Sequence, residues 1–302
     1  MTAPAPTGDG PHRRSAGARL RRLLADGRLV VAPGAFDPFT AMIIEDVGYP
    51  AVYLGGNAMG VHLGIGQPFV TMTEAVDCTV RVARAVRSPL VVDADAGFGD
   101  PAHTYRTVKE FERAGAAAIH IDDQPAPKRA HYHRGKGRVT STEEMVAKLG
   151  AALQARTDPD FLIVGKTDAL RIHTLDETLE RSRALVETGI DMLLVVDLSP
   201  RDAPRFRREL PTTPLVWIGG HRGPVPTISE IEAGGFQLAV YPFTTLAAVA
   251  QSLRDTWTTV REQGAPPHTE DLLSDMRRHV LELVGMPTYW TIEEETTERA
   301  TD

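Results

Sequence analysis

The segment VVDADAGFGD, residues 91–100, places two aspartates directly behind an apolar run. Residues 90–92 are typical of the end of a buried strand. Side chains two positions apart in an extended chain point to the same side, so Asp93 and Asp95 are expected to share a face. Neighbouring carboxylates repel each other and lose hydration when buried, and a divalent cation would compensate both effects. For this segment alone, an Asp-rich turn with a helix cap is the alternative.

Polar side chains also follow other apolar runs of the sequence. The full set expected at such run ends is Tyr53, Asp93, Asp95, Asp122, Lys166, Asp197, His221 and Tyr241. Each of them alone has an ordinary explanation as a cap or an ion pair. Their repeated position favours an enzyme, because the C-terminal ends of barrel strands converge on one mouth where active sites lie.

The elements that would position these residues are eight short β-rich runs separated by amphipathic helical stretches. The runs are 29–33, 51–55, 90–94, 117–121, 161–166, 191–196, 214–218 and 237–241. Continuous apolar strands that alternate with helices indicate a parallel sheet covered by helices. Eight such units predict an α/β fold of the closed (β/α)₈ TIM-barrel type. No Gly-rich phosphate-binding loop follows any run, which argues against a nucleotide-binding fold.

Composition excludes several classes of protein. The net charge of −7 argues against a nucleic-acid partner, which would favour a basic face. No run approaches 18 apolar residues, so no membrane span is predicted, and no apolar export signal follows Arg13 and Arg14. The single cysteine, Cys78, rules out an intrachain disulfide and suits a reducing compartment. A cytoplasmic location is therefore expected.

The chain is expected to divide into four segments. Residues 1–18, rich in Pro, Gly and Ala, are predicted to be disordered, and residues 19–255 to form the catalytic barrel. Residues 256–290 are assigned to a C-terminal helical extension and residues 291–302 to an acidic tail.

The connection after AAIHIDDQ is unusually long. Residues 125–138 carry many basic and aromatic side chains between Pro and Gly: Lys128, Arg129, His131, Tyr132, His133, Arg134, Lys136 and Arg138. A loop of this length inside a compact domain is usually functional, often a lid. A basic flap over an acidic mouth would hold a small anionic substrate; the alternative is a solvated basic loop.

Several motifs together resemble the isocitrate lyase/phosphoenolpyruvate mutase superfamily. They are VVDADAGFGD, AGAAAIHIDDQ, PKR, ARTDPDFLIVGKTDAL and AVYLGG, and their order makes the resemblance specific from about residue 29 to about residue 255. The branch most like this chain contains methylisocitrate lyase and related 2-oxo-acid lyases and decarboxylases. The resemblance implies a (β/α)₈ barrel, a homotetramer or dimer with C-terminal helices exchanged between subunits, a bound Mg²⁺ (or Mn²⁺) ion, and a reaction that passes through an enolate.

The resemblance also implies roles for individual residues. Asp93 and Asp95 match the metal-binding aspartates, and Asp122 stands where the family usually has glutamate. Tyr53, Gly55 and Gly56 match the family's Y-L-S-G-G loop, which holds a carboxylate with backbone amides, although its serine is Gly55 here and its last glycine is Asn57. Lys128 matches the first basic residue of the lid motif.

The departures from the family pattern affect the chemistry. The lid cysteine, a proton carrier in the lyases, is Ala130, and His131 and Tyr132 replace the glycine and histidine that follow it. The arginine of the family's A-R-T-D-A motif is Lys166 here, a point charge in place of a bidentate clamp. Val196 stands at the usual glutamate position. The distal carboxylate-binding segment reads IGGHRGPVP and contains His221 and Arg222. These differences argue against cleavage of isocitrate or methylisocitrate themselves.

The sequence therefore favours a Mg²⁺-dependent lyase that breaks a C–C bond in a small 2-oxo or 2-hydroxy acid, by decarboxylation or by retro-aldol or retro-Claisen cleavage. The expected catalytic residues are Lys128, His131, Tyr132 and His221; the substrate-binding residues are Tyr53, Gly55, Gly56, Asn57, Asp93, Lys166 and Arg222; the metal ligands are Asp93, Asp95 and Asp122. One alternative is phosphonomutase or phosphonopyruvate hydrolase chemistry, although the lid lacks the asparagine of those branches. A non-catalytic binding paralogue is the alternative from another class.

Overall fold

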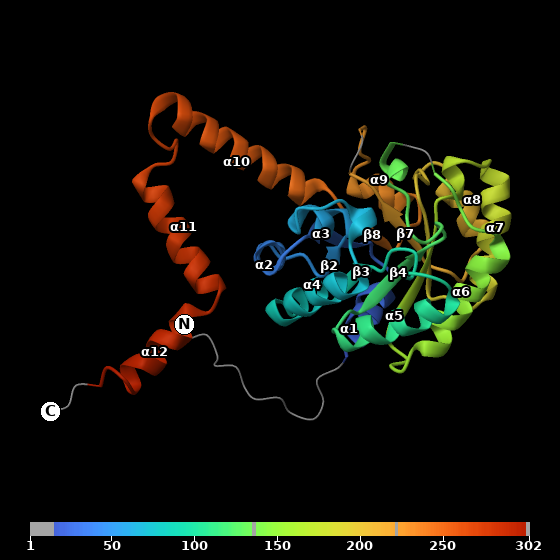
Figure 1. The fold of residues 1–302 in the computed structure, drawn as a ribbon, viewed down its shortest axis with the longest axis horizontal. Coiled ribbons are helices and arrows are strands. Elements are labelled where there is room, and N and C mark those ends of the chain that lie inside the picture. The colour runs from blue at the N-terminus through green and yellow to red at the C-terminus, as the bar shows by residue number, and fades with distance from the viewer. Residues whose placement is uncertain (1–14, 135–136, 221–222, 300–302) are drawn as a thin grey trace. The chain divides into compact units, whose positions relative to one another are not determined.

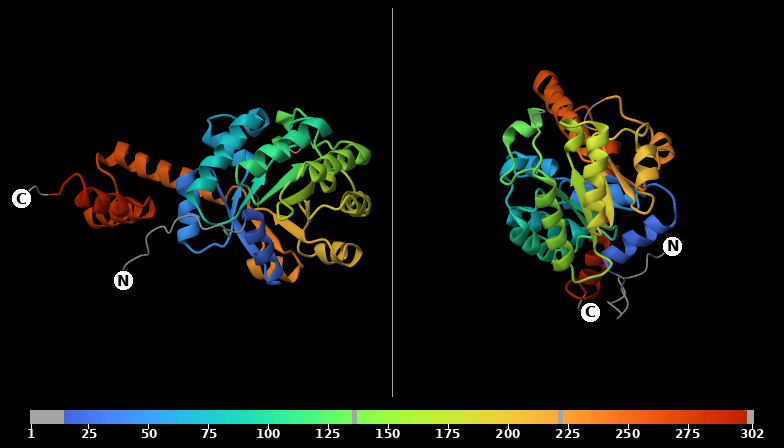
Figure 2. Two further views of the ribbon diagram at one scale, coloured as in Figure 1. Left: turned by 90° about the horizontal axis from the view of Figure 1, so that it is seen from below. Right: turned by 90° about the vertical axis from the view of Figure 1, so that its right-hand side faces the viewer.

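The computed structural model describes residues 15–134, 137–220 and 223–299. Eight parallel strands close into a barrel in the order β1 to β8, and β1 pairs with β8 (Figure 1). Helices cover the outside of the strands, as a second direction of view also shows (Figure 2). The predicted (β/α)₈ barrel is therefore confirmed.

Each of the eight expected runs overlaps one strand. The strands are β1 (Val30–Ala35), β2 (Val52–Leu54), β3 (Leu90–Asp93), β4 (Ala118–Asp122), β5 (Leu162–Thr167), β6 (Met192–Val195), β7 (Leu215–Ile218) and β8 (Leu238–Tyr241). Successive residues of each strand alternate between two apolar clusters, as the pleat requires. One cluster fills the barrel and includes Val91, Val164 and Leu194. The other lies between the strands and the helices and includes Val92, Ile163 and Leu193.

The described helices differ at their N-terminal ends, and most of them, although not all, follow a residue whose side chain accepts a hydrogen bond from an N–H of the first turn. The helices are α1 (Ala16–Ala25), α2 (Pro38–Asp46), α3 (Gly56–His62), α4 (Met72–Ala85), α5 (Pro101–Arg113), α6 (Thr142–Ala155), α7 (Leu175–Glu187), α8 (Ala203–Glu209), α9 (Ile228–Ala233), α10 (Thr244–Gln263), α11 (Glu270–Leu283) and α12 (Met286–Glu295), with short 3₁₀ turns η1 (Gln67–Phe69), η2 (Ala130–Arg134) and η3 (Ala169–Arg171). Thr71, Thr174 and Thr227 each form a capping box with a glutamate three residues later. These caps satisfy N–H groups that would otherwise be unpaired at the start of each of these helices.

Helix α1 packs against the apolar interior of the barrel. Leu20 is fully buried in the same cluster as the inward-facing strand residues. Arg21 donates hydrogen bonds to the carbonyls of Pro159 and Asp160 and forms an ion pair of 2.6 Å with Asp191. These groups lie just before β5 and β6, so α1 closes the N-terminal end and leaves the C-terminal end open.

The described residues form two compact units, residues 15–247 and residues 248–299. The first unit holds the barrel. In the second, α11 and α12 contact each other, and no residue of α10, α11 or α12 is buried. Across the described part of the chain, no helix is long and apolar enough to cross a membrane.

The limits of the helices can be compared with the four segments expected from the sequence. Helix α1 begins at Ala16, inside the segment 1–18, whose first 14 residues lie outside the described part of the chain. The expected limit at residue 255 falls within α10, and α12 extends to Glu295. The division into four segments stays a prediction.

Two helical glycines give a matched test of this packing. A Cβ at Gly17 in α1 would overlap the Asp160 carbonyl, whereas a Cβ at Gly150 in α6 meets nothing within 4 Å. We expect Gly17→Ala to lower the free energy of unfolding by about 1–3 kcal/mol, because backbone must move. Gly150→Ala should raise it by about 0.5–1 kcal/mol, because alanine favours a helix interior. Urea denaturation measures both; a stabilised Gly17→Ala would contradict the packing of α1.

Candidate functional site

The charged residues predicted at the strand ends meet at the open mouth of the barrel. Asp93 ends β3, Asp122 ends β4, and Lys166 is the next-to-last residue of β5. The strand register sets Asp93 beside His120 and Asp122 beside Lys166. All four side chains are buried, and Asp122 is inaccessible to solvent.

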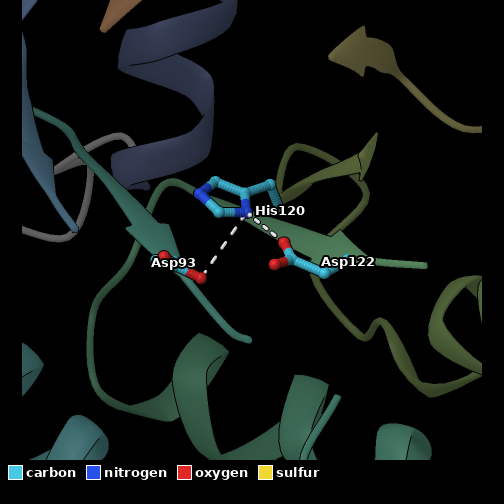
Figure 3. Close-up of side chains that lie close together, drawn as sticks. All are labelled: Asp93, His120 and Asp122. Atoms are coloured by element: carbon cyan, nitrogen blue, oxygen red, sulfur yellow. Dashed lines mark ion pairs between the residues drawn. The ribbon is translucent and has the colours of Figure 1, made fainter. Parts of the chain in front are cut away.

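Asp93, His120 and Asp122 bring three potential metal-ligating atoms within 4.8 Å of one another (Figure 3). His120 Nδ1 lies 3.3 Å from Asp122 Oδ1 and 3.7 Å from Asp93 Oδ1. Among the described residues, the buried His120 Nδ1 has no partner in hydrogen-bond geometry, and Asp122 Oδ1 is paired with the Lys166 ammonium at 2.7 Å. A buried ring nitrogen normally finds a partner, so a nitrogen that faces two carboxylates fits a bound cation.

Tyr53 orients His120 from below the mouth. Its hydroxyl lies 2.8 Å from His120 Nε2, and the two rings stack with 5.8 Å between their centroids. Burial, followed by the nearby charges of Asp93 and Asp122, raises the pKa of Tyr53 well above its usual value, so the hydroxyl stays protonated. The hydrogen bond from Tyr53 fixes the orientation of the imidazole ring, so that His120 Nδ1 faces the carboxylates of Asp93 and Asp122.

The prediction missed His120. It stands two residues before Asp122 on the same strand, and side chains at that spacing share a face. This spacing was the available signal, but a histidine inside an apolar run such as AAIHI is also typical of a buried strand without a function.

Asp95 reaches the site by a different route from the one expected. The chain turns after Asp93, and Asp95 adopts a left-handed φ of 51° while its N–H donates to Asp93 Oδ1 at 2.9 Å. The expectation of a shared face on an extended chain is therefore wrong. Asp95 lies outside the group of three, and its Oδ2 lies 3.0 Å from Lys128 Nζ.

Lys128 and Lys166 partly compensate the charge of the buried carboxylates. Lys128 Nζ lies 2.8 Å from Asp122 Oδ2, so it bridges Asp95 and Asp122, and Lys166 Nζ lies 2.7 Å from Asp122 Oδ1. Burial alone would raise the pKa of Asp122, but the two ammonium groups hold it well below its usual value. Burial opposes the charge of both lysines too, yet Asp122 raises their pKa, so both remain protonated.

The loop predicted to hold a carboxylate contacts Asp93 in this structure. The Gly56 N–H donates to Asp93 Oδ2 at 3.0 Å, and Gln67 Nε2 donates to the same oxygen at 3.2 Å. A Cβ at Gly56 would lie 2.9 Å from that oxygen, so glycine permits the approach. Gly55 and Asn57 line the adjacent cavity, and their role toward a substrate stays a prediction.

A cavity of about 300 Å³ opens beside the charged cluster. Its lining consists of Tyr53, Gly55, Gly56, Asn57, Gln67, Asp93, Tyr132, Lys166, Arg171, Val196, Ile218, Pro242 and Phe243. This volume is at the small end of the range for ligand pockets. The cavity can therefore take a small molecule, and Lys166 and Arg171 give it cationic groups for an anion.

The expected lid contributes Tyr132 to the lining of this cavity. Lys128 anchors it at the carboxylates, and the Tyr132 hydroxyl donates to Asp168 Oδ1 at 3.0 Å. The Arg171 guanidinium lies 5.0 Å from the centre of the Tyr132 ring. Burial is the largest cause that raises the pKa of Tyr132 to about 12.

The other predicted proton carriers are placed differently. His131 is exposed, and it lines a separate depression with Arg129 and Arg138 rather than the cavity. Among the expected proton carriers that the structure describes, Tyr132 is therefore the one that lines the cavity. His221 and Arg222 lie outside the described residues.

Asp123 and Asp168 are two further buried carboxylates next to the site, and neither was predicted from the sequence. Asp123 is buried and accepts hydrogen bonds from the Thr167 hydroxyl at 2.5 Å and the Asp168 N–H at 3.0 Å, and it forms an ion pair of 2.9 Å with Arg181. Asp168 in turn accepts from Gln124 at 2.7 Å and from Tyr132. Thr167 and Asp168, which follow Lys166 at the end of β5, were the available sequence signal for these buried carboxylates.

Comparisons with known proteins agree with this geometry. The sequence profile of the family described as phosphoenolpyruvate phosphomutase matches residues 20–261. The chain is 37% identical to 2,3-dimethylmalate lyase of Eubacterium barkeri over 264 residues, which cover 85% of this chain and 90% of the relative. It is 34% identical to 2-methylisocitrate lyase of Aeropyrum pernix over 289 residues, which cover 94% and 92%.

The structure is similar to that of oxaloacetate acetylhydrolase in complex with the inhibitor 3,3-difluorooxalacetate. The TM-score is 0.85 at 26% identity, and the match covers 94% of this chain and 97% of the other. The comparisons confirm the predicted enzyme class, a carbon–carbon lyase. The chain belongs to the phosphoenolpyruvate mutase/isocitrate lyase superfamily.

Proposed function

We propose that the protein uses a divalent metal ion to break a C–C bond in a small 2-hydroxy or 2-oxo carboxylic acid. The observation that carries this proposal is the buried set of Asp93, His120 and Asp122 next to a cavity with two cationic side chains. A metal ion and fixed cations at one cavity suit an anion that gains negative charge during bond cleavage.

The proposed ion is Mg²⁺, with Mn²⁺ as the alternative. Carboxylate oxygens are the ligands that both ions favour, and Asp93 and Asp122 offer them. Asp95 would join these ligands once its carboxylate is no longer paired with Lys128. When bound, the ion would supply a Lewis acid that stabilises the charge developing on the substrate oxygen.

Lys166 and Arg171 are proposed to hold the substrate carboxylate. Both line the cavity, and the charge of Lys166 is secured by its ion pair with Asp122. A protonated lysine is a poor nucleophile, so this environment favours an electrostatic role over a Schiff base.

Tyr132 is proposed as the proton donor that replaces the missing lid cysteine. Cleavage of a C–C bond leaves an electron pair on one of the two carbons (the retained carbon in a decarboxylation), and a proton must reach that carbon. Tyr132 lines the cavity, and its pKa of about 12 keeps its hydroxyl protonated at neutral pH. Its bond to Asp168 fixes the hydroxyl in place until the substrate competes for it.

The assembly is proposed to be a homotetramer or dimer through the C-terminal helices. Large apolar side chains are exposed on α10, α11 and α12: Leu253, Trp257, Leu272, Leu273, Met276, Tyr289, Trp290 and Ile292. Apolar surface of this extent normally marks an interface, and a second copy of this chain is the proposed occupant. The single cysteine supports the proposed location in a reducing cytoplasm.

The C–C lyase reaction can be tested with purified protein and Mg²⁺. A panel of 2,3-dimethylmalate, oxaloacetate, methylisocitrate and phosphonopyruvate is assayed for release of 2-oxo acid, CO₂ and inorganic phosphate. We expect the protein to cleave a C–C bond in at least one of the three phosphorus-free acids. EDTA should abolish this activity. Tyr132→Phe should lower kcat by about 10²–10⁴-fold, the usual contribution of general acid catalysis. The proposal would be contradicted if phosphonopyruvate released phosphate while none of the three phosphorus-free acids was cleaved.

The role of Lys166 is tested by substitution and chemical trapping. Lys166→Arg keeps a cation at the site and should reduce activity less than about tenfold, whereas Lys166→Met should reduce it about 10²-fold or more. Borohydride reduction in the presence of the accepted 2-oxo acid, read by intact mass, should give no covalent adduct. An adduct that disappears in Lys166→Met would show a Schiff base instead.

The proposed assembly is tested by light scattering. The full chain should have the mass of a dimer or tetramer, and Trp257→Asp should shift it toward the monomer because a charge would then be buried at the interface. Thr258→Asp, an exposed neighbour, is the matched control. A monomeric full chain would refute the assembly.

A further inference from the structure

Arg181, on α7, contacts the chain on both sides of the lid. Its side chain is 9% exposed, and its guanidinium forms an ion pair of 2.9 Å with Asp123, which precedes the lid segment, residues 125–138. The same guanidinium donates hydrogen bonds to the Thr140 carbonyl and the Thr142 hydroxyl, each at 3.0 Å, and both residues follow that segment. A single, largely buried side chain therefore joins the two ends of the lid to α7.

The two ends of the lid also contact each other. The Thr140 N–H donates to the Asp123 carbonyl at 2.7 Å, and this bond closes the base of the loop. Arg181 contacts the same two residues through the carboxylate of one and the carbonyl of the other. A planar guanidinium holds several acceptors at fixed angles, whereas an ammonium is a point charge on a flexible stem. The contacts of Arg181 therefore fix how the two lid ends lie against each other.

A second route leads from Arg181 to the Tyr132 hydroxyl. The Asp123 carboxylate that pairs with Arg181 also accepts a hydrogen bond from the Asp168 N–H at 3.0 Å. The Asp168 carboxylate in turn accepts from the Tyr132 hydroxyl at 3.0 Å and from Gln124 Nε2 at 2.7 Å. Arg181 itself does not line the cavity, whereas Tyr132 does. Arg181 would therefore affect chemistry in the cavity through Tyr132.

Lys128, the other lid residue at the site, is held by different groups. Its ammonium lies 3.0 Å from the Asp95 carboxylate and 2.8 Å from that of Asp122. These ion pairs anchor Lys128 independently of the hydrogen bonds that hold Tyr132. Loss of the Arg181 contacts is therefore expected to displace Tyr132 more than Lys128.

We infer that Arg181 is a positioning residue: it holds the two ends of the lid together and, through Asp123 and Asp168, keeps the Tyr132 hydroxyl at the cavity. The catalytic part of this inference rests on the proposed function, because it takes Tyr132 as the proton donor of a C–C lyase. The positional part rests on hydrogen bonds between described residues and can be measured without turnover.

A double-mutant cycle tests the route through Tyr132. On an acid that the protein cleaves with Mg²⁺, Arg181→Met should lower kcat about 10–10²-fold, because a small displacement of a proton donor is costly. In the Tyr132→Phe background, the same substitution should lower kcat less than about twofold, because the group that it displaces is already absent. A merely structural Arg181 would give the same loss in both backgrounds.

The chain offers a matched control on the same helix. Arg183 pairs with Glu209 at 2.8 Å, but its side chain is 45% exposed, and Arg183→Met should leave kcat within about twofold. Arg181→Met leaves the buried Asp123 carboxylate unpaired, so thermal unfolding must establish that the variant is folded. Arg181→Lys keeps a cation there without the planar three-way contact, and it should show the same effects at a smaller size.

Fluorine NMR reports on Tyr132 without turnover. The chain has six tyrosines, all of which can be labelled as 3-fluorotyrosine, and the resonance that Tyr132→Phe removes is that of Tyr132. We expect this resonance to move by more than its linewidth in Arg181→Met and to stay in place in Arg183→Met. A loss of stability without repositioning would leave the resonance of the folded protein unchanged.

The outcomes separate this inference from the proposed function. If the Tyr132 resonance stays in place in a folded Arg181 variant, or if the loss of kcat is equal with and without the Tyr132 hydroxyl, the inference is wrong and the proposed function stands. If the resonance moves but the protein cleaves none of the acids, Arg181 positions Tyr132 and the proposed function fails.

Discussion

Asp122 is the buried charge on which the mouth of the barrel depends. It has no solvent-accessible surface, and its two carboxylate oxygens lie 2.7 and 2.8 Å from the ammonium groups of Lys166 and Lys128. A buried carboxylate is tolerated only when it is paired, and removal of one partner typically costs about 3–5 kcal/mol. This requirement ties the ends of β4 and β5 to the segment that carries Lys128, so strand ends and lid form one unit.

The same charges explain why a metal ion suits this position. Asp93, Asp95 and Asp122 contribute three carboxylates, and Lys128 and Lys166 contribute two ammonium groups. Together these five groups carry a net negative charge at a buried site. A divalent cation would compensate that charge and could take over the carboxylate oxygens that Lys128 now occupies. Lys128, as part of the lid, thereby links the charge state of the centre to the segment that contributes Tyr132 to the cavity.

Much of this architecture could be predicted from the sequence because it follows from local rules. Apolar runs and the polar residues at their ends located Asp93, Asp122 and Lys166 at one mouth, since parallel strand ends converge. His120 was missed because a histidine within an apolar run is also typical of a core.

Other features depend on backbone geometry and on long-range packing. The turn at Asp95 and the bond from the Gly56 N–H to Asp93 follow from φ angles and chain approach that spacing does not encode. The position of His131 outside the cavity depends on the path of the lid, which has no periodic pattern. Asp168 and Arg171 both contact Tyr132, which lies more than 30 residues earlier in the chain, and no local pattern encodes that approach.

The central claim is that the buried carboxylates at the ends of β3 and β4 bind a divalent cation. Titration of the full chain with Mg²⁺ by calorimetry tests it most directly, with Asp122→Asn as the disrupting variant and Asp197→Asn, at the same mouth but outside the group of three, as the matched control. Thermal unfolding would establish that each variant is folded. We expect one Mg²⁺ per chain, an affinity at least about tenfold weaker in Asp122→Asn, and an unchanged affinity in Asp197→Asn. Equal affinity in the wild type and in folded Asp122→Asn, or no Mg²⁺ binding by the wild type, would contradict the account.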